Sequence, residues 1–160
     1  MTEQEHADHL PARLSLLAAN ERAIATLYEE YAARFPAQSD FWSGLADDEK
    51  QHATWLEELG LPDATSPGTS PFRFAPEAIE TFTSYVREQT NEVRAGHVWP
   101  AVALTTAYFI ETALMERRFF EQLAPDIGPV GAVMSRLVRS TAEHVNKVKD
   151  ASRQGRSGGL

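Results

Sequence analysis

The chain has 160 residues and contains no cysteine. This absence excludes disulfide bonds, thiolate zinc sites and cysteine nucleophiles within the chain. It also excludes iron–sulfur clusters and rubredoxin-type iron, because cysteine thiolates hold both of these centres. Any metal ion in this chain must therefore be bound by histidine, aspartate, glutamate or water.

Long hydrophobic runs and an excess of basic residues are missing as well. The most apolar stretch, Ala101 to Met115, is interrupted by Glu111 and several threonines and is too short to span a bilayer. The first ten residues, MTEQEHADHL, do not have the basic start and apolar run of a secretory signal. The formal net charge of -8 disfavours binding to the phosphates of nucleic acid. We therefore expect a cytoplasmic protein that binds neither membranes nor nucleic acid.

Apolar residues recur at helical spacing along most of the chain, and no segment alternates as a β-strand does. Prolines, glycines and small polar residues mark where the helices begin and end. The sequence predicts an all-α protein with helices over about 11–35, 39–59, 76–95, 98–123 and 128–154. We expect one helical domain over residues 11–153, with an N-terminal tail at 1–10 and a flexible tail at 154–160.

The connections between these helices indicate the topology. Short loops join the first two helices and the last two, which makes each pair an antiparallel hairpin. The segment from Gly60 to Gly96 is far too long for a hairpin turn and contains its own shorter helix. It reads as a crossover that lets the helices on either side of it run parallel. A four-helix bundle with one long crossover is the ferritin-like arrangement.

Ionisable residues lie on helix faces that are otherwise apolar. Glu49 and His52 are three residues apart and share one face with Leu45 and Leu56. Glu21, Glu111 and His144 occupy similar positions on the other long helices. Burial of several carboxylates without compensation costs several kcal/mol each, and a pair of divalent metal ions would remove this cost. Carboxylate and imidazole ligands without thiolate suit iron, manganese or zinc.

An internal repeat relates the two halves of the chain. The segment LADDEKQHATWL, which begins at Leu45, aligns with LVRSTAEHVNKV, which begins at Leu137. The alignment places His144 opposite His52 but Thr141 opposite Glu49, so one carboxylate is missing. Glu143 does not replace it, because it lies about 200° round the helix from Thr141. Either water fills the gap beside Thr141, or only the half formed by Glu21, Glu49 and His52 binds a metal.

The residues from about Leu10 to Ser152 resemble the ferritin-like superfamily, in particular its rubrerythrin-like di-iron branch. The resemblance rests on LLAANERAIATLYEEYAARFP, FWSGLADDEKQHATWLEELG and GHVWPAVALTTAYFIETALMERRFFEQL. Members of this family hold two metals with a glutamate on two helices and a Glu-x-x-His motif on the other two. The resemblance assigns Glu21 and Glu111 to the single glutamates, and Glu49 with His52 to the first motif. His144 matches the histidine of the second motif.

Two functions remain open at this stage. The resemblance implies one or two bound iron ions per chain. It also implies a peroxidase or ferroxidase type of activity, with oxygen, peroxide or ferrous iron as substrate. An external electron donor would be needed, because the rubredoxin-like module is absent. The helix faces of Tyr28, Tyr31 and Tyr108 predict that they lie near the site. They could bond to the ligands, carry radicals or simply pack in the core. The alternative is a degenerate scaffold without a filled site that acts through protein contacts or as a homodimer, and mineral storage in a shell is a weaker third hypothesis.

Overall fold

A computed structural model describes residues 3–59, 76–117 and 128–157 of the chain, with side chains over 12–59, 76–115, 128–129 and 131–155. Within these ranges the structure is helical and contains no β-strand. The elements are α1 (Glu3–Arg34), the short 3-10 helix η1 (Pro36–Gln38), α2 (Ser39–Leu59), α3 (Pro76–Arg94), α4 (Pro100–Arg117) and α5 (Pro129–Ser157). None of these helices combines the length and apolar character that crossing a membrane requires.

Most of the predicted helix boundaries agree with this structure, but the predicted start of the first helix was wrong. The sequence predicts a start at Pro11, whereas α1 begins at Glu3. A proline inside a helix removes one N–H group and crowds the carbonyl four residues earlier, but residues 3–10 contain no glycine or further proline, and α1 continues through Pro11. The helix α5 extends to Ser157, beyond the expected end near Gln154. The predicted loop over 60–75 and the predicted end of the fourth helix near Leu123 lie outside the described residues.

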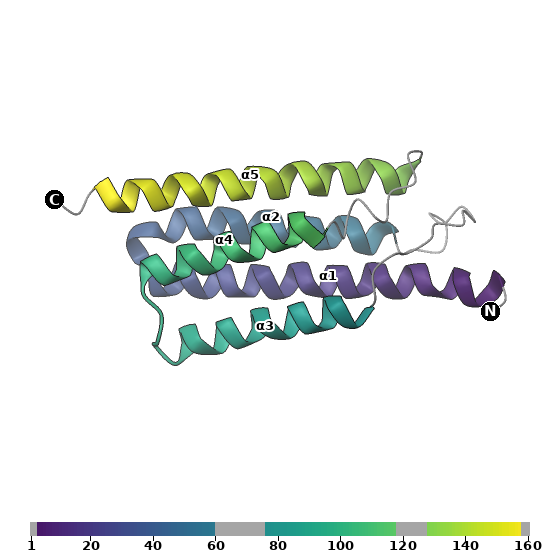
Figure 1. The fold of residues 1–160 in the computed structure, drawn as a ribbon, viewed down its shortest axis with the longest axis horizontal. Helices are drawn as coiled ribbons and strands as arrows, with labels where there is room; N and C mark the ends of the chain where they lie inside the picture. The colour runs from purple at the N-terminus through teal and green to yellow at the C-terminus, as the bar shows by residue number, and fades with distance from the viewer. Residues whose placement is uncertain (1–2, 60–75, 118–127, 158–160) are drawn as a thin grey trace.

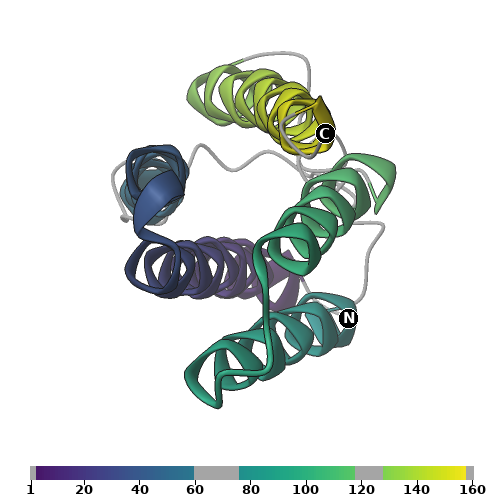
Figure 2. The same cartoon turned by 90° about the vertical axis from the view of Figure 1, so that its left-hand side faces the viewer.

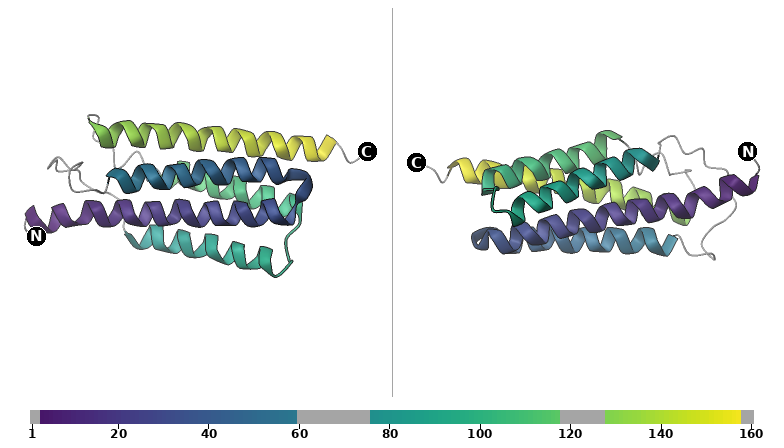
Figure 3. Two further views of the ribbon diagram at one scale, coloured as in Figure 1. Left: turned by 180° about the vertical axis from the view of Figure 1, so that it is seen from behind. Right: turned by 90° about the horizontal axis from the view of Figure 1, so that it is seen from below.

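The helix α1 is the central element of the fold. It packs most extensively against α2 and also lies against α3, while α4 packs against α5 and α2 borders α5. Viewed along the helices, α1, α2, α5 and α4 surround a common interior and α3 lies on the outer side of α1 (Figure 2). The helices α2 and α4 run in one direction and α1, α3 and α5 in the other (Figures 1 and 3).

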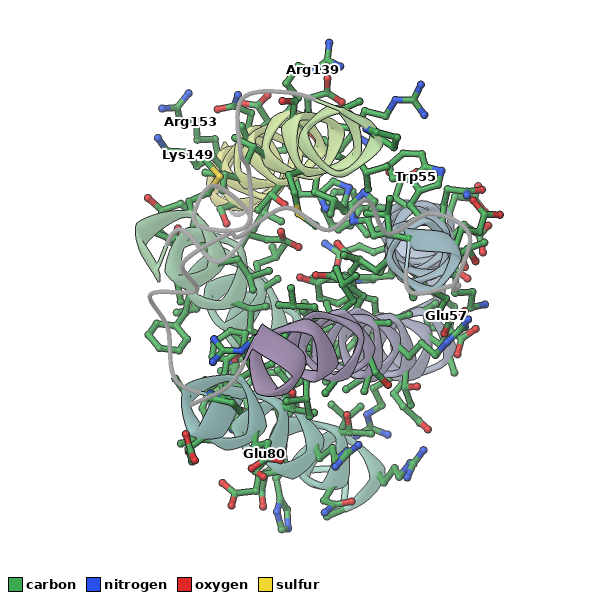
Figure 4. All side chains as sticks on the ribbon, turned by 90° about the vertical axis from the view of Figure 1, so that its right-hand side faces the viewer. Trp55, Glu57, Glu80, Arg139, Lys149 and Arg153 are labelled. Carbon is green, nitrogen blue, oxygen red and sulfur yellow. The ribbon has the colours of Figure 1, made fainter. Side chains whose placement is uncertain are left out.

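The core follows from this central position of α1. Leu17, Ile24 and Leu27 are completely buried because one side of α1 meets α2 and another meets α3. Charged side chains such as Glu57, Glu80 and Arg139 point outward from the helices (Figure 4). Exposed ion pairs such as that of Arg22 with Glu57 contribute little, about 0–1 kcal/mol each. The stability of the fold therefore comes mainly from burial of apolar side chains.

The end of α3 is fixed by a glycine. Gly96 has φ +80, in the left-handed region that a side chain disfavours. Its N–H donates to the carbonyl of Val93 at 3.0 Å, and the N–H of His97 donates to the carbonyl of Glu92 at 3.0 Å. These two hydrogen bonds form a Schellman motif, which ends the helix. The chain then turns, and Pro100 begins α4, which contributes one side of the interior.

We predict that Gly96→Ala lowers the free energy of unfolding by about 1 kcal/mol, because alanine in the left-handed region is strained by about that amount. The added Cβ would meet only Arg34 Nη2, at 3.7 Å, so contacts do not add to the cost. Urea unfolding measures the change. The control is Gly44→Ala within α2, where nothing lies within 4 Å of the new Cβ. We expect this control to raise stability by about 0.5–1 kcal/mol, and equal effects of the two substitutions would contradict the prediction.

Candidate metal centre

The five ionisable residues singled out in the sequence meet in the interior of the molecule. The helices α1, α2, α4 and α5 each contribute at least one of them. All five side chains are at most 2% exposed. They are Glu21, Glu49, His52, Glu111 and His144.

Glu49 lies at the centre of this cluster. Its Oε2 atom is 3.0 Å from His52 Nδ1, and its Oε1 atom is 2.8 Å from His144 Nδ1. Glu21 Oε2 lies 3.6 Å from His52 Nδ1, and Glu111 Oε1 lies 3.5 Å from His144 Nδ1. The two oxygens of one carboxylate therefore face two different histidines, each of which has a second glutamate beside it.

The cluster divides into two groups that share Glu49. One group is Glu21, Glu49 and His52, and the other is Glu49, Glu111 and His144. In each group, one ligand atom from every residue lies within 4.8 Å of the others. Each half thus offers two carboxylates and one imidazole, so the half that contains Glu111 has as many donor residues as the half that contains Glu21. The alignment of Thr141 with Glu49 predicted one carboxylate fewer in the half that contains Glu111, and the sharing of Glu49 gives that half its second carboxylate.

Each histidine turns Nδ1 toward the cluster and Nε2 away from it. His52 Nε2 is 2.7 Å from Ser140 Oγ, and His144 Nε2 is 3.1 Å from Asp48 Oδ2. Lys147 Nζ donates to the same Asp48 oxygen at 3.3 Å. In the neutral imidazole, which is the form that binds a metal, an N–H at Nε2 held by such a partner would leave the lone pair of Nδ1 directed at the carboxylates. Metal-binding histidines almost always have an outer partner of this kind, which fixes the tautomer and the ring orientation.

These outer contacts follow the internal repeat of the sequence. Asp48 and Ser140 each stand four residues before the histidine of their own helix, and each contacts the histidine of the other helix. The two rings, His52 and His144, stack with their centroids 5.5 Å apart. We did not single out Asp48 or Ser140 from the sequence. The signal was available, because the alignment of the two halves places them opposite each other, directly before Glu49 and Thr141.

Thr141 lies where the repeat would place a further carboxylate. Its side chain is 2% exposed, and it precedes His144 by one turn on the inward face of α5. Glu143 is exposed, as its angular position on the helix predicted. Among the described residues, the cluster therefore contains three carboxylates, two imidazoles and a neutral hydroxyl group at the position of a fourth carboxylate.

Tyr28 adds a further polar contact to the cluster. Its hydroxyl group donates to Glu111 Oε1 at 2.7 Å, and its side chain is fully buried. Tyr31 is also buried but packs against other aromatic rings, with its centroid 4.8 Å from that of Trp42. Tyr108 is 38% exposed on α4. Of the three tyrosines predicted near the site, Tyr28 is the one whose hydroxyl group bonds to a candidate ligand.

Burial and proximity shift the proton equilibria of the carboxylates. Burial raises the pKa of Glu21 well above its usual range, and the charge of Glu49 raises it further. Burial also raises the pKa of Glu111, again with a contribution from Glu49. Burial alone would raise the pKa of Glu49, but its contacts with Glu21 and the two histidines outweigh burial and lower that pKa.

The two histidines supply the positive charge that balances these carboxylates. Burial alone would lower the pKa of His52, but its contacts with Glu21 and Glu49 raise the pKa to about 10. Burial has the same lowering effect on His144, and contacts with Glu111 and Glu49 raise its pKa to about 11. In the metal-free protein both imidazoles therefore carry a proton at neutral pH. A metal ion has to displace these protons, because an imidazole ligand must be neutral.

Unsatisfied polar atoms in the cluster also indicate that its donor set fits a metal ion. Four buried polar atoms of the cluster have no hydrogen-bond partner among the described residues, namely Glu21 Oε1, Glu49 Oε1, Glu111 Oε2 and His144 Nδ1. Glu49 Oε1 and His144 Nδ1 are 2.8 Å apart, in electrostatic contact but without the alignment of a hydrogen bond. Each unsatisfied buried group costs about 1–3 kcal/mol, and such groups are rare in proteins. Metal coordination would satisfy all four.

Comparisons of the chain with protein-family models, curated proteins and solved structures gave no match. The functional argument therefore rests on the geometry and chemistry of this cluster.

We predict that the thermal stability of the metal-free protein falls as the pH rises from about 6.5 to about 10. The ordinary pKa of histidine is 6.5, and that of His52 is about 10 in the folded chain. The stabilising effect of this proton is therefore complete below pH 6.5 and is lost as the pH rises through the pKa of the folded state. Thermal unfolding with a chelator present, followed by circular dichroism over this range, measures the effect.

Two variants test the cause of this pH dependence. His52→Gln removes the titrating group, so we expect a flatter profile than that of the native chain. His97→Gln changes an exposed histidine beyond the end of α3, and we expect it to keep the native profile. A native profile that shows no decline between these pH values would contradict the prediction.

Proposed function

We propose that this chain is a rubrerythrin-like member of the ferritin-like superfamily that binds two metal ions, iron foremost, at Glu21, Glu49, His52, Glu111 and His144. The proposed activity is redox handling of oxygen, peroxide or ferrous iron. The observation that supports it most is the convergence of buried, unsatisfied carboxylate and imidazole atoms around Glu49. Manganese and zinc also suit these ligands.

The arrangement of the helices supports the superfamily assignment. The helices α2 and α4 run parallel, and α3 lies between them in the sequence (Figure 1). This order is the one expected for a four-helix bundle of α1, α2, α4 and α5 in which the connection from α2 to α4 is the crossover. The position of α3 on the outer side of α1 leaves the interior to the helices that carry the cluster (Figure 2).

Bound iron would supply single electrons to oxygen or peroxide. The residues of the chain would position the ions, balance their charge and exclude water from the site. Glu49 presents one oxygen to each half of the site, while Ser140 and Asp48 hold the two imidazoles in place. Thr141 offers no carboxylate, which leaves fewer protein ligands on that side than in the family pattern. Electrons would come from an external donor, because the chain has no cysteine-bound iron module.

We predict that the native chain takes up about two ferrous ions under anaerobic conditions, one for each half of the site. Glu49→Gln should lower uptake in both halves, because Glu49 is common to them and glutamine keeps the shape but not the charge. Glu21→Gln and Glu111→Gln should each lower uptake by about half. Elemental analysis after removal of loosely bound ions measures the stoichiometry.

Glu143→Gln is the matched control for this experiment, because Glu143 is an exposed glutamate on α5. We expect it to bind as much iron as the native chain. Circular dichroism shows whether the helices of each variant remain folded. Uptake by Glu49→Gln equal to that of the native chain would rule out the proposed site.

The alternative function, a scaffold that acts as a homodimer, has its own observation in favour. The large exposed apolar side chains within the described part of the chain are Trp99, Tyr108 and Phe109, with exposures of 62%, 38% and 50%. They lie on α4 or directly before it, in a stretch from Val98 to Ile110 that has no charged residue. On a chain with a net charge of -8, an uncharged face is where a second copy meets the least repulsion.

We predict that the native chain sediments as a dimer and that Tyr108→Glu shifts it toward monomer, because the substitution places a negative charge on each side of the contact. Gln51→Glu is the matched control, since it adds the same charge at an exposed position of α2. Analytical ultracentrifugation over a range of concentrations distinguishes the species. A native chain that stays monomeric at every concentration would exclude the homodimer.

A further inference from the structure

The two halves of the cluster differ in the groups that hold their histidines from outside. Behind His144, Asp48 Oδ2 lies 3.1 Å from Nε2. Behind His52, Ser140 Oγ lies 2.7 Å from Nε2. The hydroxyl contact is the shorter of the two, so distance alone does not favour the half with His144. The two partners differ in whether they accept a hydrogen bond only or can also donate one.

The outer partner of a neutral imidazole selects its tautomer. A carboxylate only accepts hydrogen bonds, so Asp48 requires the hydrogen of neutral His144 to be on Nε2. Nδ1 is then free of hydrogen and faces Glu49 Oε1 at 2.8 Å. A hydroxyl group both donates and accepts, so Ser140 stabilises either tautomer of neutral His52. One of these two tautomers carries its hydrogen on Nδ1, where it prevents that nitrogen from binding a metal ion.

Asp48 is itself held in position. Lys147 Nζ donates to the same carboxylate oxygen at 3.3 Å, and Lys147 follows His144 by three residues on α5. The side chain of Asp48 is 44% exposed, whereas that of His144 is 1% exposed. The carboxylate therefore remains in contact with solvent while it holds a buried ring, and it avoids the full cost of desolvation.

The unshared glutamates of the two halves differ in the same direction. Glu111 Oε1 accepts a hydrogen bond from the Tyr28 hydroxyl group at 2.7 Å, and Glu111 Oε2 has no hydrogen-bond partner among the described residues. Glu21 Oε1 also has no such partner, and Glu21 Oε2 lies 3.6 Å from His52 Nδ1, within the cluster. In the half that contains Glu111, both unshared donors are thus oriented from outside. Ligands that are oriented in advance bind a metal with less loss of side-chain freedom.

Resting on the proposed function, we propose that the half of the cluster that contains Glu111 binds the first metal ion, and that Asp48 sets this order as a positioning residue. Outer partners of metal-binding histidines change metal affinity by about 10–100-fold. A difference of this size between the halves is enough to place a single ion almost entirely in one of them. This order is the reverse of the single-site alternative from the sequence, in which only the half with Glu21 binds a metal.

Zinc is the probe for the first test, because it takes the same ligands and has no redox chemistry. Nitrogen NMR of isotopically labelled histidine follows each Nδ1, and His52→Gln and His144→Gln assign the two signals. With one zinc ion per chain, we expect the large shift of a metal-bound nitrogen in His144 only. Equal shifts in both histidines, or a shift in His52 alone, would overturn the order of filling but leave the metal site in place. Absence of bound zinc would overturn the proposed site and the order together.

An exchange of the outer partners tests the cause of this order. The double variant Asp48→Ser with Ser140→Asp places the carboxylate behind His52 and the hydroxyl group behind His144. We expect His52 to bind half or more of the first zinc ion in this variant. A merely structural role of Asp48 would weaken binding without changing which histidine is bound. Zinc that still binds to His144 alone would therefore overturn the role of Asp48.

A smaller substitution tests the same role without a change at Ser140. Asp48→Asn keeps the shape of the side chain but introduces an amide that donates as well as accepts. We expect the affinity for the first zinc ion, measured by competition with a chelator, to fall about 10-fold or more. The matched control is Asp47→Asn, because Asp47 is 78% exposed and pairs with Lys50; it should keep the native affinity. Equal affinities of the two variants, both folded by circular dichroism, would overturn the proposal.

Discussion

The buried negative charge of Glu49 is the constraint on which the interior depends. A carboxylate in a protein interior requires a positive partner, because desolvation of a lone charge costs more than the fold can supply. Glu49 has one such partner on each side, His52 and His144, which come from two different helices. The register between α2 and α5 is thus tied to a single side chain. A shift of either helix by one residue would turn a histidine away and leave the carboxylate unpaired.

The outer partners of the two histidines differ in chemical type. His144 has the carboxylate of Asp48 behind it, and His52 has the hydroxyl of Ser140. A carboxylate makes an imidazole a stronger base than a hydroxyl group does. The two halves of the cluster are therefore alike in their inner donors but differ in the basicity of their imidazoles. The contrast between Thr141 and Glu49 is of the same kind, since in both aligned pairs, Asp48 with Ser140 and Glu49 with Thr141, the acidic residue is on α2.

The inward residues of the cluster could be predicted because charges on an apolar stripe are visible in helical periodicity. Asp48 and Ser140 could not be assigned roles in this way, because their contacts depend on how α2 and α5 lie side by side. The face of α4 was ambiguous for a different reason. Its residues are apolar nearly all round, so periodicity does not select the inward side, and Tyr108 proved to be 38% exposed. The predicted start of the first helix at Pro11 was wrong, because a single proline does not always end a helix and α1 has helical residues on both sides of it.

The sharing of Glu49 has a thermodynamic consequence for any pair of ions. One ion bound near Oε2 would change the charge available at Oε1, so filling of one half would alter the affinity of the other. The first ion would also remove protons from a common set of acids, which would alter the electrostatic work of binding the second. Linkage requires the resulting coupling free energy to be the same whichever half fills first. A single shared side chain would thus couple the occupancy of the two halves.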